Sequence, residues 1–298
     1  MRIFLTGATG FVGSAILQEL LQSGHQVLGL ARSEESANEL TRSGVQVHHG
    51  DITDLESLRA GAANCDAIIH TAFNHDFSKF QDNCKVDYHA IEALGSALIG
   101  TNRPLIVTSA IGVLPSGRIN DEDTIPTFGN SSHPRSATED AATLISKRGV
   151  CVSIVRLPPS VHGNGDHAFI PTLISIAKAK GQSAYIGEGT NRWPSVHRLD
   201  AARVYLMILE KGLRNGVYHA VAEEGVVFRD IADLIGRQLQ VPIVSLTPEK
   251  ASDHFGWFTN FAQMDLVASH KKTSEKLDWH PIQPKLTEDL ANDIYFRS

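Results

Sequence analysis

The chain has 298 residues, with 27 Lys and Arg against 33 Asp and Glu, and a formal net charge of −6. A chain of this length can form one large domain, or a domain with a smaller partner, without a disulfide framework. Its basic residues are scattered and its three cysteines have no paired spacing. This argues against a nucleic-acid-binding surface, a zinc cluster and a disulfide-rich secreted protein.

The N-terminal half alternates apolar runs with helical patterns. Apolar runs of strand length lie at residues 2–5, 26–30, 45–47, 67–70, 105–108 and 150–156. The helical patterns between them include one that ends at Gly24, one that opens at Ser33, and others at 54–62, 84–100 and 136–148. Strands that alternate with helices predict an α/β fold of the Rossmann type, a doubly wound parallel sheet with ligands at the carboxyl ends of its strands.

The alternation of strands and helices ends after Arg156, where Pro158-Pro159 and the segment 163–166 interrupt it. The remaining residues predict helices at 170–180, 201–211 and 229–239, strands at 217–220 and 243–246, and a loop at 193–200. We expect a smaller C-terminal region that shapes a substrate site. No apolar run approaches the length of a membrane span and the first strand starts at residue 2. A cytoplasmic protein with no membrane partner is therefore expected.

A glycine-rich loop, Thr6-Gly7-Ala8-Thr9-Gly10-Phe11-Val12-Gly13, follows the first strand. Three glycines let the backbone turn tightly, approach a pyrophosphate and pack the next helix on the strand. The helix N-terminus then stabilises the phosphates with free N–H groups and a partial positive charge. Because the loop lies inside a strand–helix–strand unit, we predict dinucleotide binding, with contacts from Gly7, Thr9, Gly10, Phe11, Val12 and Gly13.

The end of the second strand favours NADP(H) as the cofactor. A sheet of this type that prefers NAD usually carries a carboxylate there, which accepts from the ribose hydroxyls. This chain has Arg32 and Ser33 instead, and Arg32 could bind the 2′-phosphate of NADP through a charge-assisted contact. The alternative is that Arg32 is a solvated strand end and Ser33 only a helix cap.

Two further strand ends are expected beneath the cofactor. Asp51 and Ile52 follow the third strand, where the adenine would lie. Thr71, Ala72 and Phe73 follow the fourth strand, beneath the ribose and pyrophosphate. These assignments rest on position, since an Asp after a strand is often only a helix cap.

These motifs resemble those of the extended short-chain dehydrogenase/reductase superfamily, the group of NAD-dependent epimerase/dehydratase-like proteins. The resemblance implies a cofactor domain at residues 1–157, to which 193–220 return, and a substrate-binding region at 158–192 and 221–298. It also makes His197 and Asp200 structural, with Asp200 capping the helix at 201. The matching pieces run in the family's order: Thr6-Gly7-x-x-Gly10-x-x-Gly13, Gly50-Asp51-Ile52, Thr108-Ser109, Arg156-Leu157-Pro158-Pro159-x-x-x-Gly163, Val196-His197-x-x-Asp200-Ala201-Ala202 and Leu277-Asp278-Trp279-x-Pro281.

The chain departs from the family at its catalytic pair, Tyr-x-x-x-Lys, because none of the five tyrosines has a lysine four residues later. One alignment places His133 and Ala137 on the pair, and another, anchored on Glu139, places Ser131 and Arg135 there. The chain thus resembles atypical members, some of which look like ketoreductases and others like cofactor sensors without turnover. Epimerase or dehydratase chemistry needs a strong base, whereas hydride transfer needs mainly positioning and stabilisation of an alkoxide.

Three residues are candidates for catalysis: Ser109, His133 and His162. The resemblance places Ser109 where it would stabilise an oxyanion, although its hydroxyl could instead satisfy the backbone at the strand end. Thr108, beside it, is expected to contact the cofactor. His133 could act as a general acid, or it could mark a surface helix entry before a proline.

The segment after the sixth strand should lie against the nicotinamide. His162 and His167 bring titratable rings near the cleft, with His167 toward the substrate. Two histidines and Asp166 do not make a recognised metal site, so no metal is expected, and we favour a loop-stabilising role for Asp166 and one histidine. Cofactor contacts are expected from Pro158, Ser160 and Val161.

Aromatic residues gather after the last predicted strand, among them Phe255, Trp257 and Phe258. Such a stripe is most often packed core, but some of these rings could line an apolar pocket for a bulky or aromatic ketone. The sequence therefore predicts an NADPH-dependent reductase of a small-molecule carbonyl compound. The alternatives are an NADP(H)-sensing binding protein without catalysis and a sugar-nucleotide epimerase or dehydratase; the oligomeric state stays open.

Overall fold

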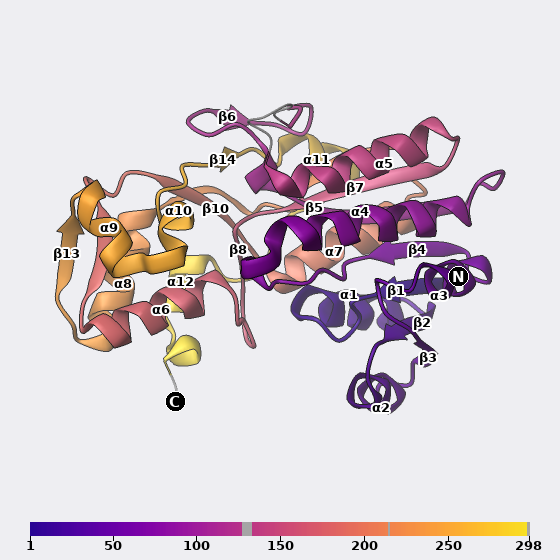
Figure 1. The fold of residues 1–298 in the computed structure, drawn as a ribbon, viewed down its shortest axis with the longest axis horizontal. Coiled ribbons are helices and arrows are strands. Elements are labelled where there is room, and N and C mark those ends of the chain that lie inside the picture. The colour runs from indigo at the N-terminus through magenta and orange to yellow at the C-terminus, as the bar shows by residue number, and fades with distance from the viewer. Residues whose placement is uncertain (127–132, 214, 297–298) are drawn as a thin grey trace.

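A seven-stranded parallel sheet forms the centre of the larger part of the molecule (Figure 1). The computed structural model describes residues 1–126, 133–213 and 215–296. The sheet has the order β11-β7-β5-β4-β1-β2-β3, which reverses between β1 and β4, so the predicted Rossmann-type α/β fold is confirmed. Its strands are β1 (Arg2–Thr6), β2 (Gln26–Ala31), β3 (Gln46–His49), β4 (Ala67–His70), β5 (Pro104–Ala110), β7 (Cys151–Leu157) and β11 (Val217–His219).

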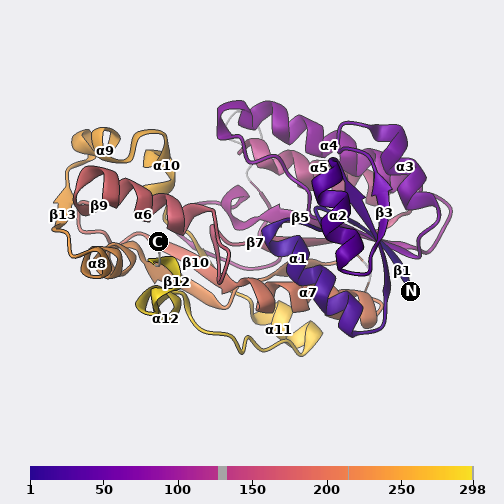
Figure 2. The same cartoon turned by 90° about the horizontal axis from the view of Figure 1, so that it is seen from below.

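Helices cover both faces of this sheet because alternate strand residues point to opposite sides. In β1, Ile3 and Leu5 pack in one core cluster and Phe4 in another. Close packing on the second face explains Gly61, whose Cβ, if it had one, would lie 2.3 Å from the Phe4 ring. The first face carries α1 (Phe11–Gln22), α2 (Glu34–Arg42) and α7 (Arg198–Glu210); the second carries α3 (Leu55–Ala63), α4 (Phe80–Ser96) and α5 (Ala137–Lys147) (Figure 2).

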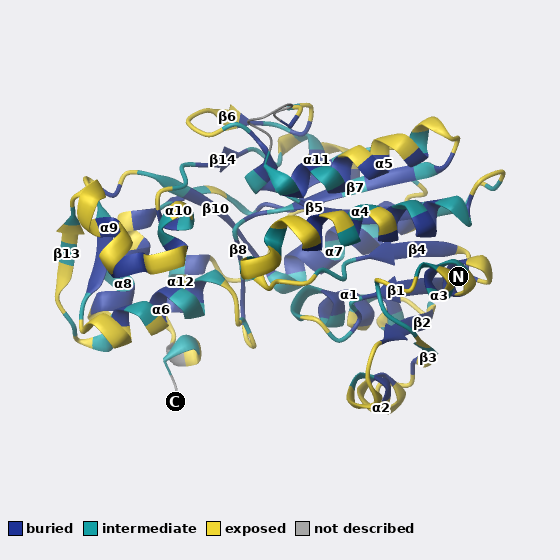
Figure 3. Cartoon of the chain, viewed as in Figure 1, coloured by how far each residue is buried: buried dark blue, intermediate teal, exposed yellow. Residues whose placement is uncertain are grey.

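The smaller part consists of short strands and helices beyond one end of the large sheet (Figure 1). Its core contains Trp193, Phe228 and Phe258, all fully buried. Figure 3 shows both buried and exposed stretches along the ribbon of this part. A three-stranded sheet has the order β12-β10-β8, and two-stranded sheets pair β13 with β9 and β14 with β6. The strands are β6 (Ile119–Asn120), β8 (Ser160–His162), β9 (Ser183–Ile186), β10 (Arg192–His197), β12 (Glu223–Val227), β13 (Ile243–Leu246) and β14 (Val267–Ala268).

The helices of this part are short, and several are single turns. Most of them pack around the three-stranded sheet or against one another, whereas the helix at 271–277 packs against α7 and β11 (Figure 2). The α-helices are α6 (Phe169–Lys180), α8 (Phe228–Leu239), α9 (Pro248–Phe255), α10 (Thr259–Ala262), α11 (Lys271–Leu277) and α12 (Leu286–Ala291). The 3₁₀ turns include η1 (Phe77–Lys79), which leads into α4, η4 (Pro134–Ser136), which leads into α5, η5 (Gly256–Phe258), between α9 and α10, and η6 (Asp293–Tyr295), which follows α12.

The segment 193–200 is not the loop that the sequence predicts. It holds most of β10, which pairs in parallel with β8 and antiparallel with β12. Helix α7 then begins at Arg198, and the His197 ring caps it, so the prediction that Asp200 caps a helix at residue 201 is wrong. Asp200 is buried and accepts from the backbone N–H groups of residues 282 and 283. Strand β10 is stabilised by its pairing with β8 and β12, and a local sequence pattern does not show this pairing.

Candidate functional site

The glycine loop packs the turn between β1 and α1 against the end of β4. Gly7 has a φ of +71°, and a Cβ there would lie 2.7 Å from the Thr71 hydroxyl and 2.8 Å from the Ala72 nitrogen. A Cβ on Gly13 would lie 1.9 Å from the Gly7 carbonyl. Gly10 caps α1 without a side-chain acceptor. The first N–H groups of α1 can therefore bind an anion such as a pyrophosphate.

The strand ends beside this loop carry the other predicted cofactor residues. Arg32 is exposed at the end of β2, and Ser33 caps α2, where its Oγ accepts from Ser36 N at 3.3 Å. Asp51 Oδ1 accepts from the Thr53 N–H at 2.8 Å and its hydroxyl at 2.7 Å, so it closes the turn before α3. Ser33 and Asp51 thus have local structural partners, whereas Arg32 is open to a ligand. Thr9, Phe11, Val12 and Ile52 are partly exposed.

A chain of buried polar groups lies beneath the crevice between β1 and β4. The Thr6 hydroxyl contacts His70 Nδ1 at 2.7 Å, and His70 Nε2 lies 3.1 Å from Asp87. The other Asp87 oxygen accepts from the Thr138 hydroxyl and lies 2.6 Å from Arg135 Nη1. Burial alone raises the pKa of Asp87, but Arg135, His70 and Thr138 outweigh burial, and the pKa lies below its usual 3.8. Asp87 is thus a buried carboxylate held ionised by its partners.

Arg135 reaches from η4 to the carboxyl ends of β4 and β5. Its guanidinium carbon lies 3.8 Å from the centre of the Phe73 ring, and Nη2 donates to the Thr108 carbonyl at 3.0 Å. Nη1 pairs with Asp87 by charge, at an angle that makes no hydrogen bond. Within the described residues, Nε and the second Nη2 hydrogen have no acceptor, so the side chain, although only 8% exposed, can donate to a ligand through these N–H groups. Ser131, the other residue of this alignment, lies outside the described residues.

Ser109 is placed differently from the sequence expectation. Its hydroxyl is buried and donates to Glu139 Oε1 at 2.7 Å. Glu139 also accepts two hydrogen bonds from Arg156, each 2.8 Å long. Since the single proton of the Ser109 hydroxyl is committed to a carboxylate, it cannot also donate to a substrate oxygen in this arrangement. The expected oxyanion role of Ser109 does not fit this geometry.

The same cluster contains a histidine that the sequence did not single out. His219 Nδ1 lies 2.8 Å from the Ser269 carbonyl and donates to it, so Nε2 accepts from Arg156 Nη1 at 3.2 Å. Burial and then the Arg156 charge lower the pKa of His219 to about 4. The folded protein therefore holds a neutral imidazole at this position.

Stability should fall as the pH drops from 6.5 toward 4, the ordinary and folded pKa values of His219. Between these values the unfolded chain binds a proton on His219 that the folded protein does not, so acid favours unfolding. His219→Gln should flatten part of this dependence of the melting temperature, while His49→Gln, at an exposed position, should leave it unchanged. An unaltered slope in His219→Gln would contradict the assignment.

The segment after β7 is held by the C-terminal end of the chain. His162 is 1% exposed and its Nδ1 lies 2.6 Å from Asp289 in α12, so this carboxylate fixes the ring; the pairing occupies Nδ1 only, and proton donation by His162 stays a prediction. Asp166 accepts from Ala168 N at 2.8 Å and from the Tyr295 hydroxyl at 2.9 Å. These contacts fit the loop-stabilising alternative. Pro158 and Ser160 are buried, whereas Val161 is partly exposed.

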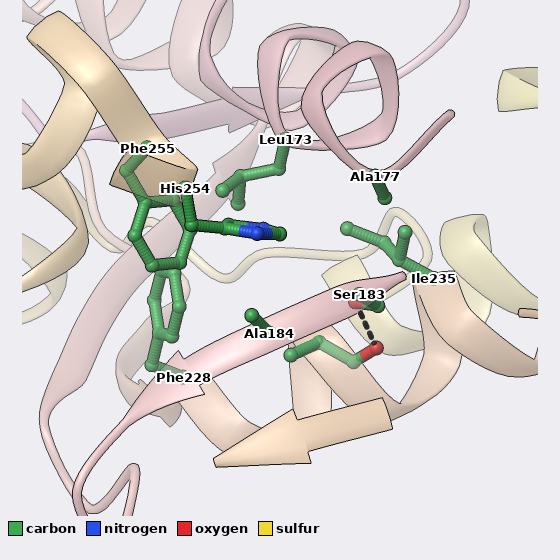
Figure 4. Close-up of a pocket in the computed structure, with 9 residues that line it drawn as sticks. Leu173, Ala177, Ser183, Ala184, Phe228, Ile235, His254 and Phe255 are labelled. Carbon is green, nitrogen blue, oxygen red and sulfur yellow. Dashed lines mark hydrogen bonds between the residues drawn. The ribbon is translucent and has the colours of Figure 1, made fainter. Parts of the chain in front are cut away.

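The predicted aromatic residues separate into core and surface. Phe255 is 3% exposed and Phe258 is fully buried, so neither lines an open site. Figure 4 shows Phe255 beside Phe228 and Leu173 around a cavity of about 10 Å³, which is no larger than one water molecule needs. Trp257, between them in sequence, is 60% exposed. Only Trp257 of the three is available to a ligand.

Comparison with known proteins now defines the family. Residues 3–221 match the model of the NAD dependent epimerase/dehydratase family. The chain belongs to this family. The uncharacterized protein C2A9.02 of Schizosaccharomyces pombe is 48% identical over 297 residues, which cover 99% of this chain and 100% of that protein.

Two more distant similarities extend over most of the chain. The 4-hydroxy-2-methyl-3-oxo-4-farnesyl-3,4-dihydroquinoline-1-oxide ketoreductase of Stigmatella aurantiaca is 24% identical over 271 residues, which cover 86% of this chain and 80% of that protein. The UDP-glucose 4-epimerase of Thermotoga maritima, solved with UDP-glucose, shares the fold with a TM-score of 0.77 at 20% identity, over 99% of this chain and 98% of that chain.

As a member of the epimerase/dehydratase family, the chain is an NAD(P)-dependent enzyme that acts on small molecules. In the part of the chain that the structure describes, no helix has the length and apolar character to cross a membrane. The described residues also contain no cluster of three or more His, Cys, Asp or Glu side chains able to hold a metal ion.

Proposed function

We propose that this epimerase/dehydratase family member is an NADPH-dependent reductase of a carbonyl compound. The observation that carries the proposal is the buried Arg135 guanidinium, which keeps N–H groups at the carboxyl ends of β4 and β5. Reduction of a carbonyl requires an electropositive donor at the oxygen, which becomes an alkoxide, but no strong base. The similarity to a ketoreductase supports the same reaction class.

The glycine loop fits a dinucleotide because its turn leaves no room for a Cβ at Gly7 or Gly13 and its helix start is uncapped. The N–H groups at the start of α1 would bind the pyrophosphate. When bound, the reduced nicotinamide supplies a hydride to the carbonyl carbon. The ends of the neighbouring strands would contact the adenine and ribose through Asp51, Ile52, Thr71, Ala72 and Phe73.

Arg135 would donate a hydrogen bond to the carbonyl oxygen and stabilise its negative charge as the alkoxide forms. Asp87 and Phe73 hold its guanidinium in place. His133 accepts the Arg135 backbone N–H at Nδ1, so its neutral ring carries the remaining proton on Nε2. Burial and the Arg135 charge lower the pKa of His133, so we assign it hydrogen bonding to the carbonyl, in place of the expected proton donation. The alkoxide would take its proton from water.

Arg32→Ala should weaken NADPH binding by about 10–100-fold and leave NADH binding unchanged, because a charge-assisted hydrogen bond to the 2′-phosphate contributes about 1.5–3 kcal/mol. Arg42→Ala, at an exposed position in α2, is the matched control and should change neither affinity. Titration of the full chain with both cofactors measures this. Native affinities that are equal for NADPH and NADH would contradict the choice of NADP.

The reaction class is tested by NADPH oxidation with a panel of ketones, quinones and imines. Turnover of a ketone, with the alcohol identified as product, is the expected result. Tight NADPH binding without turnover of any panel member would overturn the reductase proposal in favour of a cofactor-sensing protein.

A further inference from the structure

A groove of about 500 Å³ lies along the outer face of α6, close to Trp257. Figures 1 and 2 both place α6 beside the α9–α10 segment, which contains this tryptophan. The groove is shallow and open to solvent, so its shape suits an extended chain that lies along α6. We call this site the α6 groove; it is lined by Asp166, His167, Pro171, Thr172, Ser175, Ile176, Ala179 and Trp257.

Trp257 forms a fixed aromatic wall of the groove despite its exposure. Its ring stacks on Phe77 of η1, with centres 5.4 Å apart and planes 25° apart. Phe261 packs edge-on against both rings, at 6.0 Å from Trp257 and 5.3 Å from Phe77. The stacking holds the exposed Trp257 ring in place, so an apolar group in the groove could pack against it.

An aromatic strip connects the groove to the crevice below the cofactor loop. From Phe77 it continues to the His75 ring at 6.3 Å, and from there to the Phe73 ring at 5.2 Å. Arg135 lies over the Phe73 ring, at the end of the strip that is away from the groove. At the other end of the groove, the His167 ring packs edge-on against Phe11 of the glycine loop, 5.8 Å away. A ligand in the groove would therefore lie next to the cofactor site.

The polar groups along the groove are largely satisfied within the protein. The Thr172 hydroxyl donates to the Ala168 carbonyl at 2.8 Å. Asp166 accepts from Ala168 N and from the Tyr295 hydroxyl, and His167 Nδ1 lies 3.2 Å from the Gly165 carbonyl. The lining also contains the Ser175 hydroxyl, and the His167 ring keeps Nε2 for a further contact, but the larger part of the exposed lining is apolar. The lining thus favours an apolar ligand.

We propose that the α6 groove binds an apolar tail of the carbonyl substrate, an alkyl or aryl chain whose carbonyl lies at Arg135. The proposal rests on the reductase function and names its substrate class: ketones with an extended apolar substituent. A second copy of this chain could also cover such a face, and the experiment below separates the two occupants.

Tryptophan fluorescence can report the groove directly. Of the three tryptophans, Trp193 and Trp279 are fully buried and Trp257 is 60% exposed. The full chain, saturated with NADP⁺, is titrated with 2-butanone and its longer homologues up to 2-undecanone. We expect a blue shift of the emission with the long ketones and about fourfold tighter binding for each methylene that enters the groove.

Two variants and one control assign the signal to the groove. Trp257→Phe should keep the binding and lose the blue shift. Ala179→Phe should fill the groove and remove the dependence of affinity on chain length. Leu144→Phe, on the exposed surface of α5, adds the same ring elsewhere and should behave as the native chain.

Failure of this inference and failure of the reductase function give different results. Chain-length-dependent binding without NADPH oxidation would support the groove and overturn the reductase. Reduction of short and long ketones with equal affinity and no blue shift would overturn the groove alone. A blue shift that appears with protein concentration, together with a dimer in light scattering, would overturn the tail-binding proposal in favour of a second copy.

Discussion

Asp87→Ala is expected to lower the free energy of unfolding by about 3–5 kcal/mol at neutral pH, because it leaves a buried guanidinium without its counter-ion. Asp87 is fully buried, and Arg135 is 8% exposed. The substitution also leaves the Thr138 hydroxyl and His70 Nε2 without their acceptor. Denaturant unfolding followed by circular dichroism measures the change.

Asp82→Ala is the matched control on the same helix. Asp82 pairs with Lys85, but both side chains are more than two-thirds exposed, at 77% and 70%. Exposed pairs of this kind contribute about 0–1 kcal/mol. If Asp87→Ala destabilised the protein no more than Asp82→Ala, Asp87 could not be the counter-ion of Arg135.

The same carboxylate gives a pH dependence of known sign. Because the folded pKa of Asp87 lies below 3.8, its contribution is present above the unfolded value and is lost as the pH falls through the folded pKa. The difference in free energy of unfolding between the native chain and Asp87→Ala should therefore shrink as the pH falls, and vanish in strong acid.

The sequence predicts the large sheet well because local periodicity determines its strands and helices. The buried runs of β1 and β4 are continuous and apolar, as parallel strands covered on both faces must be. The glycine loop is equally local, since one turn and one helix start make the phosphate site. Beyond residue 157 the strands pair with partners that are distant in the chain, and a local pattern does not show such pairing. The sequence therefore predicts a loop where the structure has β10.

The buried polar network under the crevice could not be predicted in the same way. Thr6, His70, Asp87 and Arg135 come from four elements far apart in the chain (β1, β4, α4 and η4), and only the folded sheet brings them together. Ser109 illustrates the converse. The apolar run predicts the strand that carries Ser109 near its end. It does not predict that the Ser109 hydroxyl donates to Glu139 in α5.

The aromatic stretch shows where periodicity stops being informative. Helical spacing places Phe255, Trp257 and Phe258 close together but does not say which of them face the core. Helix α9 ends at Phe255, and the η5 turn begins at Gly256. This change of direction exposes Trp257, while both phenylalanines remain buried. A positive φ of +55° at Gly256 supports that turn. Gly256, directly before Trp257, is the feature of the sequence that indicates this break in the helix.

Arg135→Gln should reduce turnover of a reducible ketone by about 10²–10³-fold, the usual effect of removing one donor to a developing oxyanion. The single variant also leaves Asp87 buried without a cation, so lost stability could mimic lost chemistry. The double variant Arg135→Gln with Asp87→Asn removes both charges and should regain stability without regaining turnover. Arg135→Lys keeps the charge and should retain more activity than Arg135→Gln.

Single-turnover oxidation of bound NADPH separates these effects, because it measures the chemical step on protein that is folded and saturated with cofactor. Thermal unfolding of each variant is recorded alongside. If the double variant is stable and reduces the ketone as fast as the native chain, Arg135 acts only as a structural cation. If it is stable, binds NADPH normally and is slow, the guanidinium supplies the donor that Ser109, committed to Glu139, does not.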